Sequence, residues 1–323
     1  MKAITYTEYG PPDVLVLKEV DKPVCGDDEV LIKIKATTAT AGDCEIRRPD
    51  IPNLIWFFVR LYMGFRTPRK QVLGQELAGE IEAVGKNVET FKKGDQVFAT
   101  TGIHFGAYAD YICLPADGAI ALKPANMSFA EAAAVPVSGN NALHFLRRAK
   151  IKPGEKVLIH AASGSIGTYA VQIAKYYGAE VTAVCGPTSL ALITALGADK
   201  VIDYTTEDFT ENGEKYDVIF DTIGRTAYGP SLQSLNKKGR YLLANPGLGQ
   251  MFRSLWTSLT RDKTVMVAFA PDGSDHLAFL RELCEAGQLT TVIDSEYPLA
   301  QMAEAHRYVE RRQKTGNLII TVA

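Results

Sequence analysis

The chain has 323 residues, of which 46% are hydrophobic and 22% charged, a composition typical of a globular protein with room for two domains. The net charge of −2, without any Lys/Arg run, excludes recruitment of nucleic acid by bulk electrostatics, and no apolar run reaches the roughly 20 residues that span a bilayer. The five cysteines stand far apart and form no C-x-x-C pair. We therefore expect no disulfide scaffold, no structural zinc knuckle and a reducing, cytoplasmic location.

The first 125 residues are predicted to be rich in β-structure. Short alternating runs, separated by Gly, Pro and Asp, indicate strands at residues 2–6, 30–36, 79–84, 95–99 and 107–114. Helical patterns in this part are confined to residues 43–48 and the aromatic stretch 54–65.

The pattern changes at a capping box, where Ser128 is the expected helix N-cap and Glu131 follows three residues later. We expect an Ala-rich helix after it and a second helix over residues 141–149. From residue 156, strands expected at 157–160, 181–185, 200–203, 218–221, 241–244 and 265–269 alternate with helices, of which the clearest are 167–177 and 190–196. This rhythm predicts an α/β fold with a doubly wound parallel sheet.

The C-terminal part returns to a mixed pattern, with helices expected at 275–286 and 302–312 and a strand at 318–322. We assign this tail to the first domain. Residues 1–125 and 272–323 are thus expected to form one β-rich domain, and residues 126–271 a Rossmann nucleotide-binding domain.

A strand, a tight turn of small residues and a helix follow one another at residues 157–167. The turn has the pattern A-x-G-x-x-G and consists of Ala162, Ser163, Gly164, Ser165, Ile166 and Gly167. Small residues let the backbone approach a pyrophosphate, and the helix N-terminus offers N–H groups and the positive end of its dipole. An ordinary βα turn can share the pattern, but its place at the first strand of the series favours dinucleotide binding.

The choice of cofactor depends on the end of the second strand. NAD sites usually carry an acid there, and residues 181–198 contain none, which favours NADPH over NADH. Thr188 and Ser189 are candidates to bind the 2′-phosphate, although Ser189 can equally serve as a helix N-cap. Lys200 and Tyr204, near the end of the third strand, are expected to supply a charge and a hydroxyl.

Further motifs occur in order along almost the whole chain: GPP at 10–12, GQELAGEIEAVG at 74–85, KGDQV at 93–97, AAVP at 133–136, LGADKVIDY at 196–204 and FDTIG at 220–224. With the glycine turn, they resemble the medium-chain dehydrogenase/reductase superfamily in its quinone oxidoreductase-like branch. The resemblance implies a GroES-like β domain beside a Rossmann domain, with the active site in the cleft. It also implies a homodimer that transfers hydride from NADPH to a quinone or an α,β-unsaturated carbonyl.

The zinc alcohol dehydrogenases of that superfamily need three metal ligands, which this sequence lacks. Thr40 stands where they carry a Cys, Gln75 stands where they carry a His, and residues 137–140 contain no Cys or Asp. Because hydroxyl and amide groups are poor zinc ligands, we expect no zinc and a reaction that depends on positioning in a dry cleft.

The candidate catalytic residues are Asp43, Arg47, Asn141 and Tyr62. The resemblance matches Asp43 to the last residue of an Asn-Pro-x-Asp motif and Asn141 to a Thr beside the nicotinamide. For Asp43 we favour ordering of a turn or of an Arg over acid catalysis. Arg47 either steadies an oxyanion or is solvated, and Asn141 either binds the nicotinamide or substrate or caps a helix.

The turn Asn245, Pro246 and Gly247 follows the fifth strand of the series, so we expect it to contact the nicotinamide. Both tryptophans lie in apolar segments, Trp56 in residues 54–63 and Trp256 in residues 251–259. Core packing or a dimer contact is one interpretation of these segments. The alternative is that they flank the cleft mouth for a small lipophilic substrate or rest peripherally on a membrane surface.

Two other functions stay open at this point. The missing Asn and Pro ahead of Asp43 are compatible with a low-turnover, NADPH-binding regulatory protein. A zinc-free alcohol or enoyl-thioester reductase is the enzymatic alternative, and NADPH oxidation against a panel of acceptors separates these functions.

Overall fold

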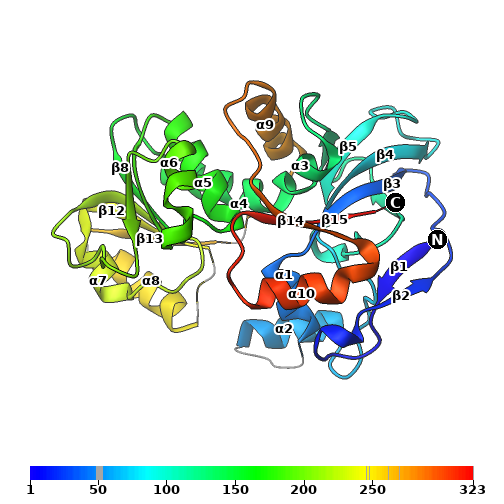
Figure 1. Cartoon of the computed structure of the whole chain (residues 1–323), viewed down its shortest axis with the longest axis horizontal. Helices are drawn as coiled ribbons and strands as arrows, with labels where there is room; N and C mark the ends of the chain where they lie inside the picture. Colours follow the sequence, from blue (N-terminus) through cyan, green and yellow to red (C-terminus); the bar gives the residue numbers. More distant parts are fainter. Residues whose placement is uncertain (49–53, 245, 247, 261, 269, 323) are drawn as a thin grey trace. The chain divides into compact units, whose positions relative to one another are not determined.

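The structure is a computed structural model, which describes residues 1–48, 54–244, 246, 248–260, 262–268 and 270–322. It divides into two compact units, the first formed by Met1–Asn140 with Asp272–Ala323 and the second by Asn141–Pro271 (Figure 1). The first division falls after Asn140 rather than after residue 125, within helix α4 (Val135–Ala149). The N-terminal turn of α4 belongs to the first unit because the N–H of Val137 donates to the buried carboxylate of Glu76, 2.7 Å away.

The first unit contains a seven-stranded sheet in which β14-β15-β3-β4-β5-β7 are neighbours and β6 pairs with β3. Its strands are β3 (Glu29–Thr38), β4 (Glu76–Val84), β5 (Gln96–Thr100), β6 (Tyr111–Pro115), β7 (Ile120–Leu122), β14 (Ile293–Pro298) and β15 (Asn317–Thr321). A separate antiparallel pair consists of β1 (Lys2–Thr5) and β2 (Val16–Glu19). The assignment of the C-terminal tail to this unit follows directly from the pairing of β15 with β3.

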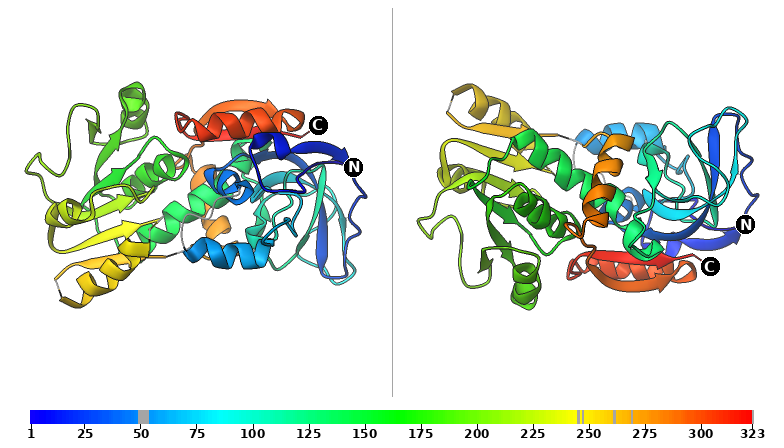
Figure 2. Two further views of the ribbon diagram at one scale, coloured as in Figure 1. Left: turned by 90° about the horizontal axis from the view of Figure 1, so that it is seen from below. Right: turned by 90° about the horizontal axis from the view of Figure 1, so that it is seen from above.

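Helices of the first unit are α1 (Ala41–Arg47), α2 (Leu54–Met63), α3 (Phe129–Ala133), α9 (Ser274–Glu285) and α10 (Met302–Glu310). The capping box at Ser128 and Glu131 is confirmed, since each side chain accepts the other residue's backbone N–H at the start of α3. Figure 2 shows α10 packed along β14 and β15. The expected start of a helix at Asn141 was wrong: α4 begins at Val135 and carries Asn141 in its interior.

The second unit is built on six parallel strands in the order β10-β9-β8-β11-β12-β13. The strands are β8 (Lys156–His160), β9 (Glu180–Cys185), β10 (Lys200–Asp203), β11 (Tyr216–Asp221), β12 (Leu235–Leu243) and β13 (Thr264–Val267). In chain order this is 3-2-1-4-5-6, the doubly wound arrangement predicted from the sequence. Chain order reverses between β8 and β11, where ligands bind in such sheets.

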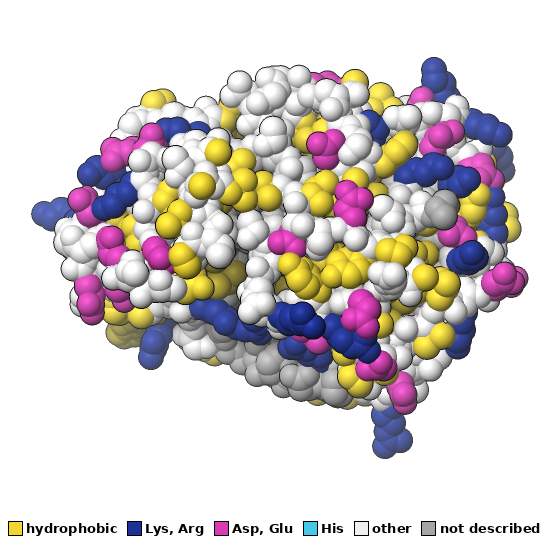
Figure 3. Space-filling model, in the orientation of Figure 1, with side chains coloured by type: hydrophobic (Ala, Val, Ile, Leu, Met, Phe, Trp, Pro, Cys, Tyr) yellow, Lys and Arg dark blue, Asp and Glu magenta, His cyan; other side chains and the backbone are white. Residues whose placement is uncertain are grey.

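Helices cover both faces of this sheet, with α5 (Ser165–Tyr176) and α6 (Leu190–Ala195) on one and α7 (Tyr228–Gln233) and α8 (Leu248–Thr260) on the other (Figure 1). A buried cluster that includes Leu158, Ile219 and Leu243 holds the strands to their neighbours. Within the described ranges, no helix has the length and apolarity needed to cross a membrane. Lys/Arg and Asp/Glu side chains are interspersed on the face drawn in Figure 3, so this face carries charges of both signs.

Candidate dinucleotide site and buried polar network

The turn between β8 and α5 brings the backbone of a loop and a helix into close contact. Ala161 adopts a left-handed conformation with φ 56°, and α5 begins directly after Gly164. A Cβ on Gly167 would lie 2.4 Å from the carbonyl oxygen of Ala161, which only glycine avoids. No side chain caps α5 at Gly164, so this N-terminus offers its N–H groups and dipole to an anion.

His160 and Asp221 end the two strands between which chain order reverses. Nδ1 of His160 lies 3.3 Å from Oδ1 of Asp221, whose carboxylate is fully buried. Asp221 also accepts the N–H groups of Gly224 and Thr226, at 2.9 and 2.8 Å. Burial alone raises the pKa of Asp221, but the hydrogen bonds from His160 and Thr226 outweigh it and the pKa is lowered. This pair therefore holds the loop after β11 in place.

The carboxyl end of β9 carries the loop expected to meet the 2′-phosphate. Thr188 is exposed, whereas Ser189 is buried and gives no side-chain cap to α6, although it occupies the N-cap position. Tyr204 follows β10 and is exposed, and its ring lies 3.5 Å from a Cβ built on Gly186. Thr188 and Tyr204 thus stand at the same edge of the sheet.

Lys200 lies at the opposite end of the sheet. It is the first residue of β10 and pairs with Thr182, while Asp203 at the carboxyl end pairs with Cys185. The expectation that Lys200 stands near the end of this strand was wrong, because the parallel register places it at the amino edge. At the end of β12, Pro246 is buried, and Asn245 and Gly247 lie outside the described residues.

In the first unit, Asp43 organises the start of α1. Its Oδ2 accepts the hydroxyl and N–H of Thr40, at 2.6 and 3.2 Å, and its Oδ1 accepts the N–H of Gly74 at 3.2 Å. The side chain is completely buried, and burial raises the pKa of this carboxyl despite these bonds. These bonds hold Asp43 to the turn at the start of α1.

Arg47 is also completely buried, so the solvated alternative was wrong. The guanidinium donates to the carbonyl oxygen of Gly10, to Oε1 of Glu310 and, over 3.3 Å, to Nδ1 of His306. The hydroxyl of Tyr108 lies 3.2 Å from Nε2 of the same ring. The bonds of Arg47 thus join parts of the first unit, and Tyr108 extends this network through its contact with the His306 ring.

The two remaining catalytic candidates differ in exposure. Tyr62 is 41% exposed on α2, and its hydroxyl donates to the carbonyl oxygen of Ile103 over 3.3 Å. Asn141 is partly buried within α4. Because Asn141 is an interior residue of the helix, the N-cap alternative was wrong for it.

The sequence reasoning missed Glu76, a fully buried carboxylate at the start of β4. Its Oε1 accepts the hydroxyl of Thr38 at 2.5 Å, and its Oε2 accepts the N–H of Val137. Burial raises the pKa of Glu76 to about 7, and burial lowers the pKa of nearby Lys314 to about 8. The available signal was the position of Glu76 as the third residue of the 74–85 motif, but the partners of Glu76 lie far away in the sequence.

Thr40 and Gln75, the residues at the family's zinc-ligand positions, both lie beside α1. A Cβ built on Gly42 would be 3.6 Å from Oγ1 of Thr40 and 3.5 Å from Oε1 of Gln75. Thr40 already bonds Asp43. This donor set does not fit zinc, which takes thiolate, imidazole and carboxylate ligands. Across the described residues, no cluster of three or more His, Cys, Asp or Glu side chains suits a metal ion.

Comparison with known proteins agrees with this architecture. Residues 26–124 match the Alcohol dehydrogenase GroES-like domain family, and residues 196–320 match the Zinc-binding dehydrogenase family. A chloroplastic quinone-oxidoreductase of Triphysaria versicolor is 31% identical over 99% of this chain and 98% of its own length. An NADPH-dependent alkenal/one oxidoreductase, chloroplastic, of Arabidopsis thaliana is 30% identical over 99% of this chain and 79% of its own length.

Among solved structures, the Escherichia coli quinone oxidoreductase complexed with NADPH superposes with a TM-score of 0.83 at 26% identity, covering 99% of this chain and 100% of that one. The fold and site therefore define a protein with a GroES-like domain and a Rossmann domain, of the medium-chain dehydrogenase/reductase superfamily. Within that superfamily, the chain belongs to the quinone oxidoreductase-like branch.

Proposed function

We propose that the protein is an NADPH-dependent oxidoreductase that transfers hydride to a quinone or to the double bond of an α,β-unsaturated carbonyl. One observation carries the proposal: an uncapped helix N-terminus follows a glycine-bearing turn where the order of a parallel sheet reverses. The relatives named for quinone and alkenal/one reduction, which match 99% of this chain, support the choice of acceptor.

The cofactor site would be formed by the turn Ala162–Gly167 and the end of β9. The N-terminal N–H groups of α5 would bind the pyrophosphate, and Gly167 keeps the helix close enough to the loop for this contact. Thr188 and Tyr204 would donate to the 2′-phosphate, and Ser189 would support that loop from its buried position. Lack of an acid in residues 181–198 removes the charge that would repel this phosphate.

When bound, NADPH supplies the hydride. The chain's own contribution would be to orient the acceptor, exclude water and stabilise the oxygen on which negative charge develops. We assign Asp43 and Arg47 as positioning residues, since their polar atoms already bond to Thr40, Gly74, Gly10, Glu310 and His306. Asn141 and Tyr62 remain our candidates for contact with the substrate or the nicotinamide.

We propose that the reaction needs no zinc, on the ligand chemistry of Thr40 and Gln75. We propose a homodimer as well, since β13 is an edge strand whose outer backbone groups can pair with a second copy. For location we propose the cytoplasm, where the five cysteines, all free thiols, stay reduced.

A peripheral membrane contact through α2 is also proposed. Phe58, Leu61 and Phe65 are each more than half exposed. Arg66 and Arg69 follow, and residues 51–75 contain no acid. Co-sedimentation with anionic vesicles tests this contact, with Phe58→Ser as the variant expected to weaken it and Val24→Ser, another exposed apolar residue, as the control.

The experiment that tests the proposed function is NADPH oxidation by the purified protein with 1,4-benzoquinone, with 3-buten-2-one and with a saturated ketone. We expect turnover of the quinone or the enone and none of the saturated ketone. Saturable NADPH binding without turnover of any acceptor would instead support the regulatory alternative.

A further inference from the structure

One face of α8 is unusually exposed for an apolar surface. Phe252, Trp256 and Leu259 are 77%, 71% and 75% exposed and stand at helical spacing. The core-packing interpretation of this segment was therefore wrong for these three residues. Exposure of this much apolar surface on one helix usually marks a binding site.

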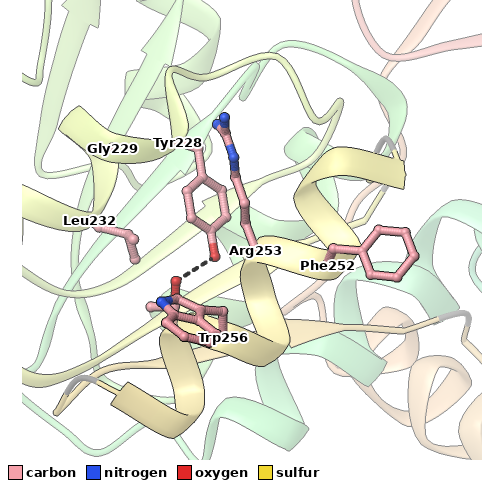
Figure 4. A pocket seen from close by; sticks show the side chains of 7 residues that line it. Tyr228, Gly229, Leu232, Phe252, Arg253 and Trp256 are labelled. Atoms are coloured by element: carbon pink, nitrogen blue, oxygen red, sulfur yellow. Dashed lines mark hydrogen bonds between the residues drawn. The ribbon is translucent and has the colours of Figure 1, made fainter.

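A pocket of about 410 Å³ opens at this face, between α7 and α8 (Figure 4). It is lined by Tyr228, Leu232, Phe252 and Trp256, and also by Gly229, where a Cβ would meet no atom within 4 Å. The hydroxyl groups of Tyr228 and Thr257 meet at 3.0 Å and join the two helices. The volume falls within the roughly 300–1,000 Å³ of small-molecule sites.

Arg253 is the single charged residue that lines the pocket. Figure 4 shows its side chain extended alongside Tyr228. Among the described residues, this guanidinium forms no hydrogen bond or ion pair, and residues 248–260 contain no acid. The pocket thus combines an apolar lining with one cation, the Arg253 guanidinium, that has no acidic partner in the described part of the chain.

We propose that the pocket between α7 and α8 binds a single-chain anionic amphiphile, a carboxylate or phosphate on a hydrocarbon chain. The hydrocarbon chain would lie against Trp256 and Phe252, whose exposed apolar surface it would cover. The head group would accept from Arg253, whose planar fork suits both anions. This site lies apart in the sequence from the glycine turn at 162–167, so its test is separate from that of the reductase activity.

The experiment uses tryptophan fluorescence in a Trp56→Phe background, which leaves Trp256 as the single reporter because the chain has two tryptophans. The probe is monomeric sodium decanoate, and decanol is the neutral counterpart. We expect a saturable change with decanoate and about tenfold weaker binding of decanol, the range expected for loss of a charged hydrogen bond. Arg253→Gln should weaken the binding of decanoate by a similar factor and leave the binding of decanol unchanged.

Two further variants separate a built site from surface adsorption. Arg148→Gln removes an exposed arginine of the same unit that does not line the pocket, and decanoate binding should be unchanged. In Gly229→Leu the new side chain would point into open space, since a Cβ there meets no atom within 4 Å. By filling the rim of the pocket, it should weaken the binding of both ligands. Unchanged melting temperatures would establish that these variants fold.

Four results would overturn the proposal. The first three are a non-saturable signal, an equal loss of decanoate binding in the Arg253 and Arg148 variants, and a response to anionic vesicles but not to monomeric decanoate. The fourth result has two parts: decanoate fails to bind, and the protein forms an oligomer that dissociates in Trp256→Ser. A second copy of the chain would then occupy the pocket. Sedimentation velocity with and without decanoate separates that case.

Discussion

Nε of Arg47 lies 3.3 Å from Nδ1 of His306, with both side chains completely buried. Burial, with the adjacent Arg47 charge, lowers the pKa of His306 to about 3, so the ring is neutral at physiological pH. Because Nδ1 accepts from Arg47, the proton of the ring is assigned to Nε2, which donates to the hydroxyl of Tyr108. These contacts connect His306 on α10 to Arg47 on α1 and to Tyr108.

This network predicts unequal effects at two neighbouring arginines. Arg47→Gln should lower the free energy of unfolding by about 3 kcal/mol or more, because it leaves buried acceptors without a partner. Arg48→Gln should cost less than about 1 kcal/mol, since Arg48 bonds the same Glu310 but is 33% exposed. Urea denaturation measures both, and equal losses would contradict the network.

Glu76 predicts a pH-dependent difference in stability. Its folded pKa is raised to about 7 from 4.5, so between these values the native state holds a proton that the unfolded state has lost. Wild-type stability therefore falls as pH rises through this window, by up to about 1.4 kcal/mol per pH unit from this group. Glu76→Gln lacks this loss. Its free energy of unfolding relative to wild type should therefore rise from pH 4.5 to 7 and stay constant above pH 7.

Thermal unfolding across that pH range measures the Glu76 effect. Glu80→Gln is the matched control, because it removes the same charge from an exposed position on the same strand. Parallel stability curves for wild type and Glu76→Gln would show that the buried carboxyl does not titrate in this window.

The glycine turn predicts that structure and binding respond to different glycines. Gly167→Ala should destabilise the protein by about 1–3 kcal/mol even without cofactor, because the new Cβ overlaps the Ala161 carbonyl. Gly164→Ala should change stability by less than about 0.5 kcal/mol, since its Cβ meets a single atom at 3.4 Å, but should weaken NADPH binding by facing the phosphates. Melting curves and NADPH titration test the pair, and equal destabilisation would be the contrary result.

Cofactor preference should depend on the end of β9 and not on Lys200. Thr188→Asp places a carboxylate where the 2′-phosphate is proposed, so the ratio of NADPH to NADH affinity should fall at least tenfold. Thr188→Asn controls for side-chain shape. Lys200→Gln, at the amino edge of β10, should leave the ratio unchanged, and a large effect there would contradict the proposed orientation of the cofactor.

Local patterns in the sequence predicted the parts of the structure that depend on neighbouring residues. The strand–turn–helix at Ala162–Gly167 and the capping box at Ser128 are of this kind, since their contacts span a few residues. The doubly wound order followed from the alternation of strands and helices. The motif around Asp43 also indicated an ordered turn.

Contacts between distant segments could not be predicted in this way. His306 meets Arg47 across 259 positions, and Val137 meets Glu76 across 61, so no local pattern signals either pair. Lys200 was misplaced for another reason: it is the first residue of the predicted strand 200–203, and the carboxyl end of a parallel strand, where ligands bind, is at Asp203. Whether Trp256 is covered or exposed was left open as well, since an apolar helical stripe has the same sequence in both cases.

The most direct test of the account is a titration of the purified wild-type protein with NADPH and NADH, followed by addition of 1,4-benzoquinone. We predict saturable binding that favours NADPH, loss of that preference in Thr188→Asp, and oxidation of the bound NADPH by the quinone without added zinc. Absence of saturable binding for either nucleotide, or a requirement for stoichiometric zinc, would contradict it.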